Sequence, residues 1–501
     1  ATALGLPYMD LSDYIVDVKL VELIPVETAK RHKAVPLFKI GNTLTVGMVD
    51  PKDIEAIDNI RRISKVDMVD PVLVSERGIQ KVIDSYYGAG ETVDAIVKSI
   101  DEKKVLPKGG KVFGKSLDDT SVIDLINIMF AQAVKDRVSD MHLEPTDETL
   151  RVRFRIDGLL REVTVIPKGL QSAIISRVKI LSKMDIAESR KPQDGRIRLK
   201  LENKDLDIRV STFPTLHGEN VVMRLLDKTS VLLGLKEVGM LENDLKLFEK
   251  VIRRPNGIIL VTGPTGSGKT STLYAALTVI NSIEKNIVTI EDPAEYELPL
   301  IRQTQVNPLA GVTFANGLRG ILRQDPDIIM VGEIRDKETA DVAIQAALTG
   351  HLVFSTLHTN DAASALTRLI DMGVEPFLAS SSVIGILAQR LVRLICDKCK
   401  EPYSPAADVL KDLDFKRGTQ FFRGKGCPKC NNTGLKGRTG IFELLVITEE
   451  IRKLIDEKKS ADEIGRKARE SGMRTLRDDG LLKAKEGLTT LEEVLRVTEV
   501  E

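Results

Sequence analysis

The segment that constrains this chain most is a glycine-rich run at residues 263–270, which fits the pattern G-x-x-x-x-G-K-[ST]. An apolar run of strand length, residues 258–262, precedes it, and a segment with apolar residues at helical spacing follows it. Glycines allow a tight turn to point backbone N–H groups at phosphate oxygens, and the N-terminus of the following helix adds positive potential. The pattern therefore predicts a phosphate-binding loop rather than an incidental turn, because both flanks are of the required kind.

Two positions of this loop have specific expected roles. Lys269 is expected to reach the β- and γ-phosphates of a nucleoside triphosphate, and the Thr270 hydroxyl is expected to ligate Mg²⁺. The full set of expected nucleotide-binding residues is Gly263, Pro264, Thr265, Gly266, Ser267, Gly268, Lys269, Thr270 and Ser271.

Strands and helices are predicted to alternate around the loop. Apolar runs of strand length lie at residues 287–290, 328–331 and 352–356, and a helix is expected to begin after Asp336 and to end at Gly350. This alternation predicts a mostly parallel sheet with helices on both faces. Aromatic residues make up only 4% of the chain and Trp is absent, so the core is expected to be aliphatic.

The charge balance and the apolar pattern exclude several classes of protein. Lys and Arg number 73, as do Asp and Glu, so the chain is not a generally basic nucleic-acid coat. No stretch approaches 18 consecutive apolar residues, and no secretory signal is visible. Four cysteines without such a signal indicate a reducing cytosol.

The 501 residues are enough for roughly three domains. In the second of them, an alternating run at residues 151–156 meets Asp157 and Gly158, a pair that tolerates positive φ and predicts a β-hairpin. The predicted units are a small α+β domain at 1–88, a linker at 89–116, a second α+β domain at 117–232 and an α/β domain at 233–501.

Acidic residues follow two of the predicted strands. The strand at 328–331 leads into Gly332 and Glu333, and Glu333 is expected to polarise an attacking water. Many phosphate-loop enzymes have an Asp where this chain has Gly332, so a second acid is needed to support the metal. Glu291 and Asp292 offer that acid at a neighbouring strand end. Solvation of the loop and helix capping are the alternative roles for these two residues.

Two histidines bracket the predicted strand at 352–356. His358 follows the strand end, and we expect it to sense the γ-phosphate or to bridge to a neighbour. A purely structural histidine is the alternative, and for His351 it is the favoured one.

The cysteines form two C-x-x-C pairs, Cys396 with Cys399 and Cys427 with Cys430. Four thiolates suit tetrahedral Zn²⁺ and leave no open position for chemistry, so the predicted zinc site is structural. Four reduced core thiols, or a redox pair, are the alternatives.

Several arginines lie on predicted strands of the second domain. A phosphate-hydrolysing site needs cations against the γ-phosphate, and Arg209 and Arg224 are candidates. Arg151, Arg153 and Arg155 share one face of an alternating strand, for which we favour a solvated or salt-bridged face. A nucleic-acid groove would need more stacking aromatics nearby.

Together these segments resemble the secretion ATPase superfamily, the motors of type II secretion and of type IV pilus assembly, and most closely the pilus assembly motors. In that family the glycine at 332 is normal. The matching stretches are residues 263–270 (Walker A), 289–295 (aspartate box), 322–327 with 330–336 (Walker B), 349–351 with 357–360 (histidine box), and 139–145 and 190–196 in the second domain.

The resemblance implies a RecA-like P-loop ATPase core, a PAS-like second domain and a zinc-binding tetracysteine subdomain. It implies ATP, Mg²⁺ and structural Zn²⁺ as cofactors. Arg209 and Arg224 match the arginines that reach the γ-phosphate when the second domain closes, with a hinge expected at 227–236. Glu291 is expected to support metal or water. The zinc module is expected at 393–437 and C-terminal helices at 448–501.

The resemblance also implies partners and a location. We expect a cytoplasmic homo-hexamer at the inner membrane, acting with a membrane platform protein and cytoplasmic pilus or secretion components, and no nucleic acid. Residues 1–88 resemble the C-terminal half of the domain that precedes pilus assembly motors. Some such domains bind cyclic di-GMP through an earlier segment that this sequence lacks, so that ligand is not predicted.

Three other interpretations stay open. Type II secretion is the alternative to pilus assembly, which is our first choice. A nucleic-acid translocase built on the same core is less favoured, given the zero net charge. A nucleotide-gated switch with negligible turnover is the third.

Overall fold

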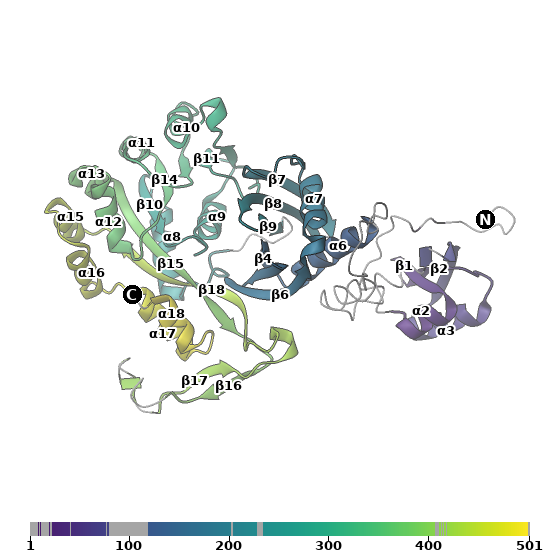
Figure 1. The fold of residues 1–501 in the computed structure, drawn as a ribbon. Coiled ribbons are helices and arrows are strands. Elements are labelled where there is room, and N and C mark those ends of the chain that lie inside the picture. Colours follow the sequence, from purple (N-terminus) through teal and green to yellow (C-terminus); the bar gives the residue numbers. More distant parts are fainter. Residues whose placement is uncertain are drawn as a thin grey trace. The chain divides into compact units, whose positions relative to one another are not determined.

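The chain divides in a computed structural model into two compact units, Ala1–Thr229 and Ser230–Glu501 (Figure 1). The predicted linker at 89–116, and most of the hinge expected at 227–236, lie outside the described residues. The structure describes residues 9, 11, 20, 23–40, 42–76, 78–79, 119–201, 204–227, 234–405, 410–411, 413, 415–416 and 418–498.

The first domain is a small α+β fold, as predicted. Strands β1 (Ala34–Ile40) and β2 (Thr43–Met48) pair antiparallel, and β3 (Met68–Leu73) joins β2 in parallel. The crossover from β2 to β3 contains α3 (Ile54–Ser64), whose first turn is capped by the side chain of Asp53. Helix α2 (Val26–His32) precedes the sheet.

The second domain is built on a six-stranded antiparallel sheet of order β6-β5-β4-β9-β8-β7. Asp157 and Gly158, with φ of 48° and 90°, form the turn between β5 and β6, so the predicted hairpin is confirmed. The strands are β4 (Val138–Pro145), β5 (Thr149–Ile156), β6 (Leu159–Pro167), β7 (Gln193–Leu201), β8 (Lys204–Thr215) and β9 (Gly218–Asp227), and the helices are α6 (Asp119–Lys135) and α7 (Gln171–Leu181).

The second unit contains a seven-stranded sheet of order β12-β11-β13-β14-β10-β15-β18. All neighbouring strands pair in parallel except β15 and β18, so the predicted mostly parallel sheet is confirmed. The strands are β10 (Gly257–Thr262), β11 (Ile287–Glu291), β12 (Arg302–Gln305), β13 (Ile328–Val331), β14 (Leu352–Leu357), β15 (Val383–Ile395) and β18 (Leu435–Val446).

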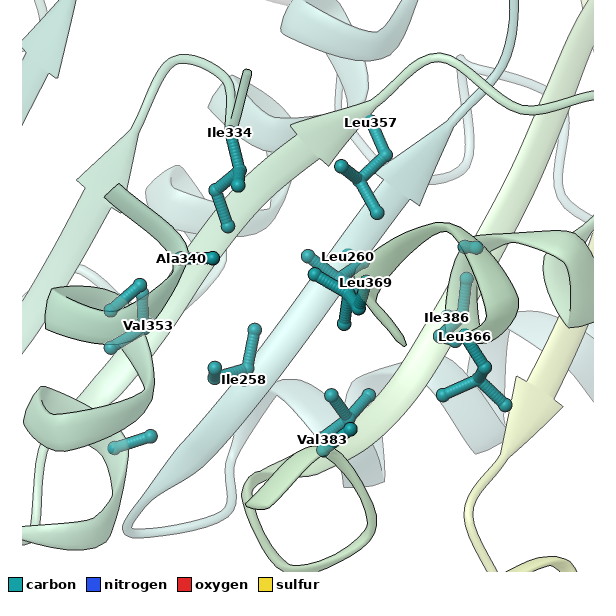
Figure 2. Packing of buried hydrophobic residues seen from close by; sticks show 14 of the residues in the cluster. Ile258, Leu260, Ile334, Ala340, Val353, Leu357, Leu366, Leu369, Val383 and Ile386 are labelled. Carbon is teal, nitrogen blue, oxygen red and sulfur yellow. The ribbon is translucent and has the colours of Figure 1, made fainter. Parts of the chain in front are cut away.

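Helices cover both faces of this sheet. On one face, Leu366 and Leu369 of α12 point at Leu260 of β10 and Ile386 of β15 (Figure 2). On the other face, α8 and α9 pack over the same strands through a second hydrophobic cluster, which includes aromatic side chains such as Phe248 and Tyr274. The helices are α8 (Glu242–Ile252), α9 (Lys269–Ile280), α10 (Phe314–Ile321), α11 (Lys337–Leu348), α12 (Ala362–Asp371) and α13 (Pro376–Ser382).

The end of the chain adds a small hairpin and four helices. The hairpin pairs β16 (Lys400–Tyr403) with β17 (Phe421–Gly424). The helices are α15 (Glu449–Asp456), α16 (Ala461–Glu470), α17 (Leu476–Lys485) and α18 (Leu491–Thr498). No helix in the described parts of the chain has the length and apolar character needed to cross a bilayer.

A buried ion pair fixes α17 against β18. Lys483 Nζ lies 2.6 Å from Asp479 Oδ2, and their side chains are 1% and 0% exposed. The same ammonium donates to the Gly440 carbonyl at 2.7 Å, and Asp479 accepts from the Phe442 N–H at 2.9 Å. Each charge is therefore compensated by its partner and by the backbone of β18.

We predict that Asp479→Ala destabilises the protein by about 3–5 kcal/mol, because it leaves the Lys483 ammonium buried without a counter-charge. Urea unfolding followed by circular dichroism measures this loss. Lys246→Ala, which removes a pair with Glu242 that is exposed on both sides, is the matched control and should leave the midpoint nearly unchanged.

Candidate functional site

The glycine-rich run turns between β10 and α9. Gly263 and Gly268 have φ of 145° and 88°, a region that residues with a Cβ rarely adopt. A Cβ on Gly263 would lie 2.4 Å from the carbonyl oxygen of Gln389, and one on Gly268 would lie 2.8 Å from its Nε2. Only glycine therefore permits this loop to lie so close to β15.

Gln389 of β15 supports the loop from the side, although we did not predict it from sequence. Its side chain is buried, and its Oε1 accepts a hydrogen bond from the Thr272 hydroxyl of α9 at 2.7 Å. A polar residue within the long apolar run of β15 was the signal that could have identified it.

Lys269 points into the loop. Its Nζ donates to the carbonyl oxygens of Gly263 and Pro264, at 2.7 and 3.1 Å. Burial lowers the pKa of Lys269, and the negative charge of Glu333 opposes that effect. The ammonium of Lys269 is thus bound to the loop backbone and interacts electrostatically with the carboxylate of Glu333, which follows β13.

The hydroxyls of the loop suit anionic oxygens and Mg²⁺. Ser267 Oγ is buried and has no hydrogen-bond partner within the described residues. Thr270, at the start of α9, is exposed and its hydroxyl is in no hydrogen bond with the described residues. An oxygen ligand that is free in this way fits a hard divalent cation.

Glu333 follows β13 and is flanked by two basic side chains. Arg335 Nη2 donates to Glu333 Oε1 at 2.5 Å, and His358 Nε2 lies 3.4 Å from Oε2. Burial raises the pKa of Glu333, but the hydrogen bond and charge of Arg335, together with His358, outweigh it, so the net shift is downward. The structure therefore brings together three predicted residues, Lys269, Glu333 and His358, and adds Arg335.

Glu291, at the end of β11, lies in a different environment. It is buried, and its carboxylate accepts from the Tyr274 hydroxyl at 2.5 Å, the Thr289 hydroxyl at 2.6 Å and Gln303 Nε2 at 3.0 Å. Burial and the nearby carboxylate raise the pKa of Tyr274. These three hydrogen bonds already use both carboxylate oxygens of Glu291. A direct contact of Glu291 with metal or water therefore stays a prediction. Tyr274 and Gln303 were not predicted.

The two candidate arginines of the second domain are neighbours. Arg209 on β8 is the direct cross-strand partner of Arg224 on β9. The sequence placed both on strands but did not predict that they pair. Arg224 Nε also lies 2.9 Å from Asp140 Oδ1 on β4. Like charges directly opposite one another destabilise a sheet unless an anion compensates them.

The arginine stripe of β5 is salt-bridged, so the interpretation that we favoured is confirmed. Arg151 Nε lies 3.0 Å from Glu162, and Arg155 Nε lies 3.6 Å from Asp140. The third member, Arg153, lies 2.5 Å from a carboxylate oxygen of Glu144.

The four cysteines converge as a tetrathiolate site requires. Their sulfur atoms all lie within 4.8 Å of one another. The Cys396–Cys427, Cys399–Cys430 and Cys427–Cys430 pairs are 3.7, 3.8 and 3.7 Å apart. Zinc–sulfur bonds of about 2.3 Å in a tetrahedron place the sulfurs about 3.8 Å apart, so the arrangement fits Zn²⁺.

Backbone and side-chain contacts support this cluster. The N–H groups of Cys427 and Gly434 donate to Cys430 Sγ at 3.2 and 3.3 Å. Lys429, between the second pair of cysteines, donates to Asp397, between the first pair, at 2.9 Å. The two N–H groups fix the position of Cys430 Sγ, and the exposed Lys429–Asp397 pair joins the two C-x-x-C loops.

We predict that Cys396→Ser lowers the zinc content of the purified protein and its melting temperature, because one of the four ligands is lost. Metal analysis and thermal unfolding measure both. Lys429→Ala, which removes only the exposed contact to Asp397, is the control and should retain zinc. A Cys396→Ser protein with unchanged zinc would contradict the metal site.

Comparison with known proteins identifies the family. The family description "Type II/IV secretion system protein" matches residues 115–496, and "MshEN domain" matches residues 4–93. The chain belongs to the type II/IV secretion system protein family. The family match covers the six-stranded antiparallel sheet, the parallel sheet with its glycine-rich loop, and the four cysteines.

The relatives of this chain have names from two different systems, type IV pilus assembly and type II secretion. The percentages below give the identity and the share of each protein that is aligned. The chain is 46% identical to the type IV pilus assembly ATPase PilB of Thermus thermophilus over 99% of its own length and 57% of the relative's length. It is 44% identical to PilB of Myxococcus xanthus, over 98% of its own length and 88% of that protein. It is 54% identical to the type II secretion system ATPase E of Vibrio cholerae, over 77% and 76% of the two chains.

Solved structures agree with the fold. The pilus retraction motor PilT with bound ADP matches 74% of this chain and 96% of its own, at 27% identity and a TM-score of 0.51. The ATPase DotB of Legionella pneumophila, at 21% identity, matches 78% of this chain and 97% of its own with a TM-score of 0.55, which shows a common fold.

Proposed function

We propose that this chain is a motor ATPase that couples ATP hydrolysis to type IV pilus assembly. One observation supports ATP hydrolysis most directly. Lys269, Glu333 and His358 converge at the carboxyl ends of β10, β13 and β14. Ligands of open parallel sheets bind at that edge.

In the proposed reaction, water attacks the γ-phosphorus of ATP and ADP leaves. Lys269 exchanges its two loop carbonyls for the β- and γ-phosphate oxygens, and the loop N–H groups bind the same phosphates. Glu333 stays ionised, accepts a hydrogen bond from the attacking water and orients it. Thr270 would hold Mg²⁺, which neutralises charge on the phosphates.

The second domain supplies cations in this proposal. Arg209 and Arg224 stand opposite one another on β8 and β9, and both are proposed to contact the γ-phosphate when the second domain closes. Loss of the phosphate then releases the second domain, with 227–236 as the hinge. Zinc would hold the tetracysteine module as a structural ion.

Pilus assembly is favoured over type II secretion by the extent of the similarity. The two pilus assembly relatives align over 98–99% of this chain, including its first domain, whereas the secretion relatives align over about three quarters of it. The higher identity of 54% to the secretion ATPases keeps type II secretion as the second candidate.

The proposed motor is a homo-hexamer in the cytoplasm. It acts on a platform protein of the inner membrane, with cytoplasmic pilus components, and without nucleic acid. The balanced charge of the chain supports the last point, because a translocase binds the phosphate backbone through an excess of cations.

We predict that Glu333→Gln lowers the steady-state rate of phosphate release by about 100-fold or more while ATP still binds, because the water loses its acceptor and the loop stays intact. Phosphate-release assays and binding of a fluorescent ATP analogue measure the two properties. Glu242→Gln, an exposed change on α8, is the control. An unchanged rate in Glu333→Gln would favour the nucleotide-gated switch instead.

A second prediction separates the two systems. When the tagged chain is purified from its native host after cross-linking, we expect a type IV pilus platform protein to be captured. Mass spectrometry identifies the protein, and the Cys396→Ser variant shows whether the zinc module contributes. Capture of a type II secretion platform protein would support the second candidate, and DNA-stimulated hydrolysis with steep salt dependence would support a translocase.

A further inference from the structure

Arg335 is a cation at the proposed active site to which the hydrolysis scheme gives no role. Its Nη2 lies 2.5 Å from Glu333 Oε1. The hydrogen bond to Glu333 and the nearby charge of Asp292 raise the pKa of Arg335. The guanidinium therefore contacts the carboxylate that follows β13 and is affected by the charge of Asp292, which follows β11.

The local backbone explains why Arg335 reaches Glu333. Ile334, between them, is buried and points into the aliphatic cluster under α11 and α12 (Figure 2). Its N–H donates to the Thr356 carbonyl at 3.1 Å, which keeps this segment alongside β14. Ile334 is buried whereas Glu333 is partly and Arg335 largely exposed, so Glu333 and Arg335 both point away from the core.

Arg335 has little to do with folding. Its side chain is 61% exposed, and within the described residues it donates no hydrogen bond other than the one to Glu333. Removing the guanidinium therefore opens no cavity and leaves no other acceptor without its donor. What the contact does fix is the position and charge of one carboxylate.

We propose that Arg335 is a positioning residue that keeps the Glu333 carboxylate ionised and turned towards the water site, with His358 on the second oxygen. This inference rests on the proposed hydrolysis, in which Glu333 orients water. Arg335 binds Oε1, and His358 Nε2 lies 3.4 Å from Oε2, so the two oxygens have different basic partners.

The charges around Glu333 determine the pH dependence. Arg335 comes from its own loop, His358 from the end of β14 and Lys269 from the start of α9, while Asp292 faces Arg335 from β11. Arg335 lowers the pKa of Glu333, so its removal allows the carboxylate to take up a proton at higher pH. The acidic limb of the rate profile then moves to higher pH.

The test compares Arg335→Gln with Arg335→Lys in the whole chain. We expect Arg335→Gln to lower kcat for ATP about tenfold, with KM within about twofold, because the carboxylate and not the phosphates loses its partner. We also expect its acidic limb at higher pH than in the wild type, and partial recovery of both properties in Arg335→Lys. Lys337→Gln, which removes an exposed pair with Asp341 on α11, is the charge-matched control.

The outcomes separate this inference from the proposed function. If Glu333→Gln abolishes hydrolysis but Arg335→Gln keeps the wild-type kcat and pH profile, Arg335 has no positioning role and the proposed function stands. A lower kcat with an unmoved acidic limb, or with no recovery in Arg335→Lys, also overturns the inference. If the wild type itself does not hydrolyse ATP, both fail. Melting temperatures of all variants verify that each is folded.

Discussion

The second unit depends on the parallel pairing of β10 with β14 on one side and β15 on the other. Every residue of β10 is buried, and each of its large aliphatic side chains contributes about 1.5–3 kcal/mol when removed from water. The strand cannot shift by one residue without exchanging its two faces, each of which packs against helices. The point at which Gly263 turns out of the sheet is therefore fixed by the core.

Two carboxylates at neighbouring strand ends show how surroundings assign different tasks to the same group. Glu291 is buried among the hydroxyls of Tyr274 and Thr289 and the amide of Gln303, which are neutral donors. Glu333 is partly accessible and meets basic side chains. Glu291 connects α9 to β11 through its hydrogen bond with Tyr274. Glu333 is partly exposed and is held ionised by its basic neighbours, which is what a group that activates water requires.

Local pattern was sufficient for much of the fold. The spacing of apolar residues and the choice of turn and capping residues predicted three features that the structure contains. They are the strand at 328–331, the Asp157–Gly158 turn and the helix capped by Asp336. Contacts set by sheet order could not be read in this way. The pairing of Arg209 with Arg224 depends on the register between β8 and β9, and the contact of Tyr274 with Glu291 depends on how α9 packs against β11, so neither could be read from the residue pattern alone.

Strand β15 runs past the phosphate loop to the first of the four cysteines. It contains Gln389, whose carbonyl lies against Gly263, and it ends immediately before Cys396. An extended strand rises about 3.3 Å per residue and scarcely stretches, so these two points are held roughly 23 Å apart. Because β15 pairs with β10 on one side and with β18 on the other, the same sheet that positions the phosphate loop also sets its separation from the four cysteines.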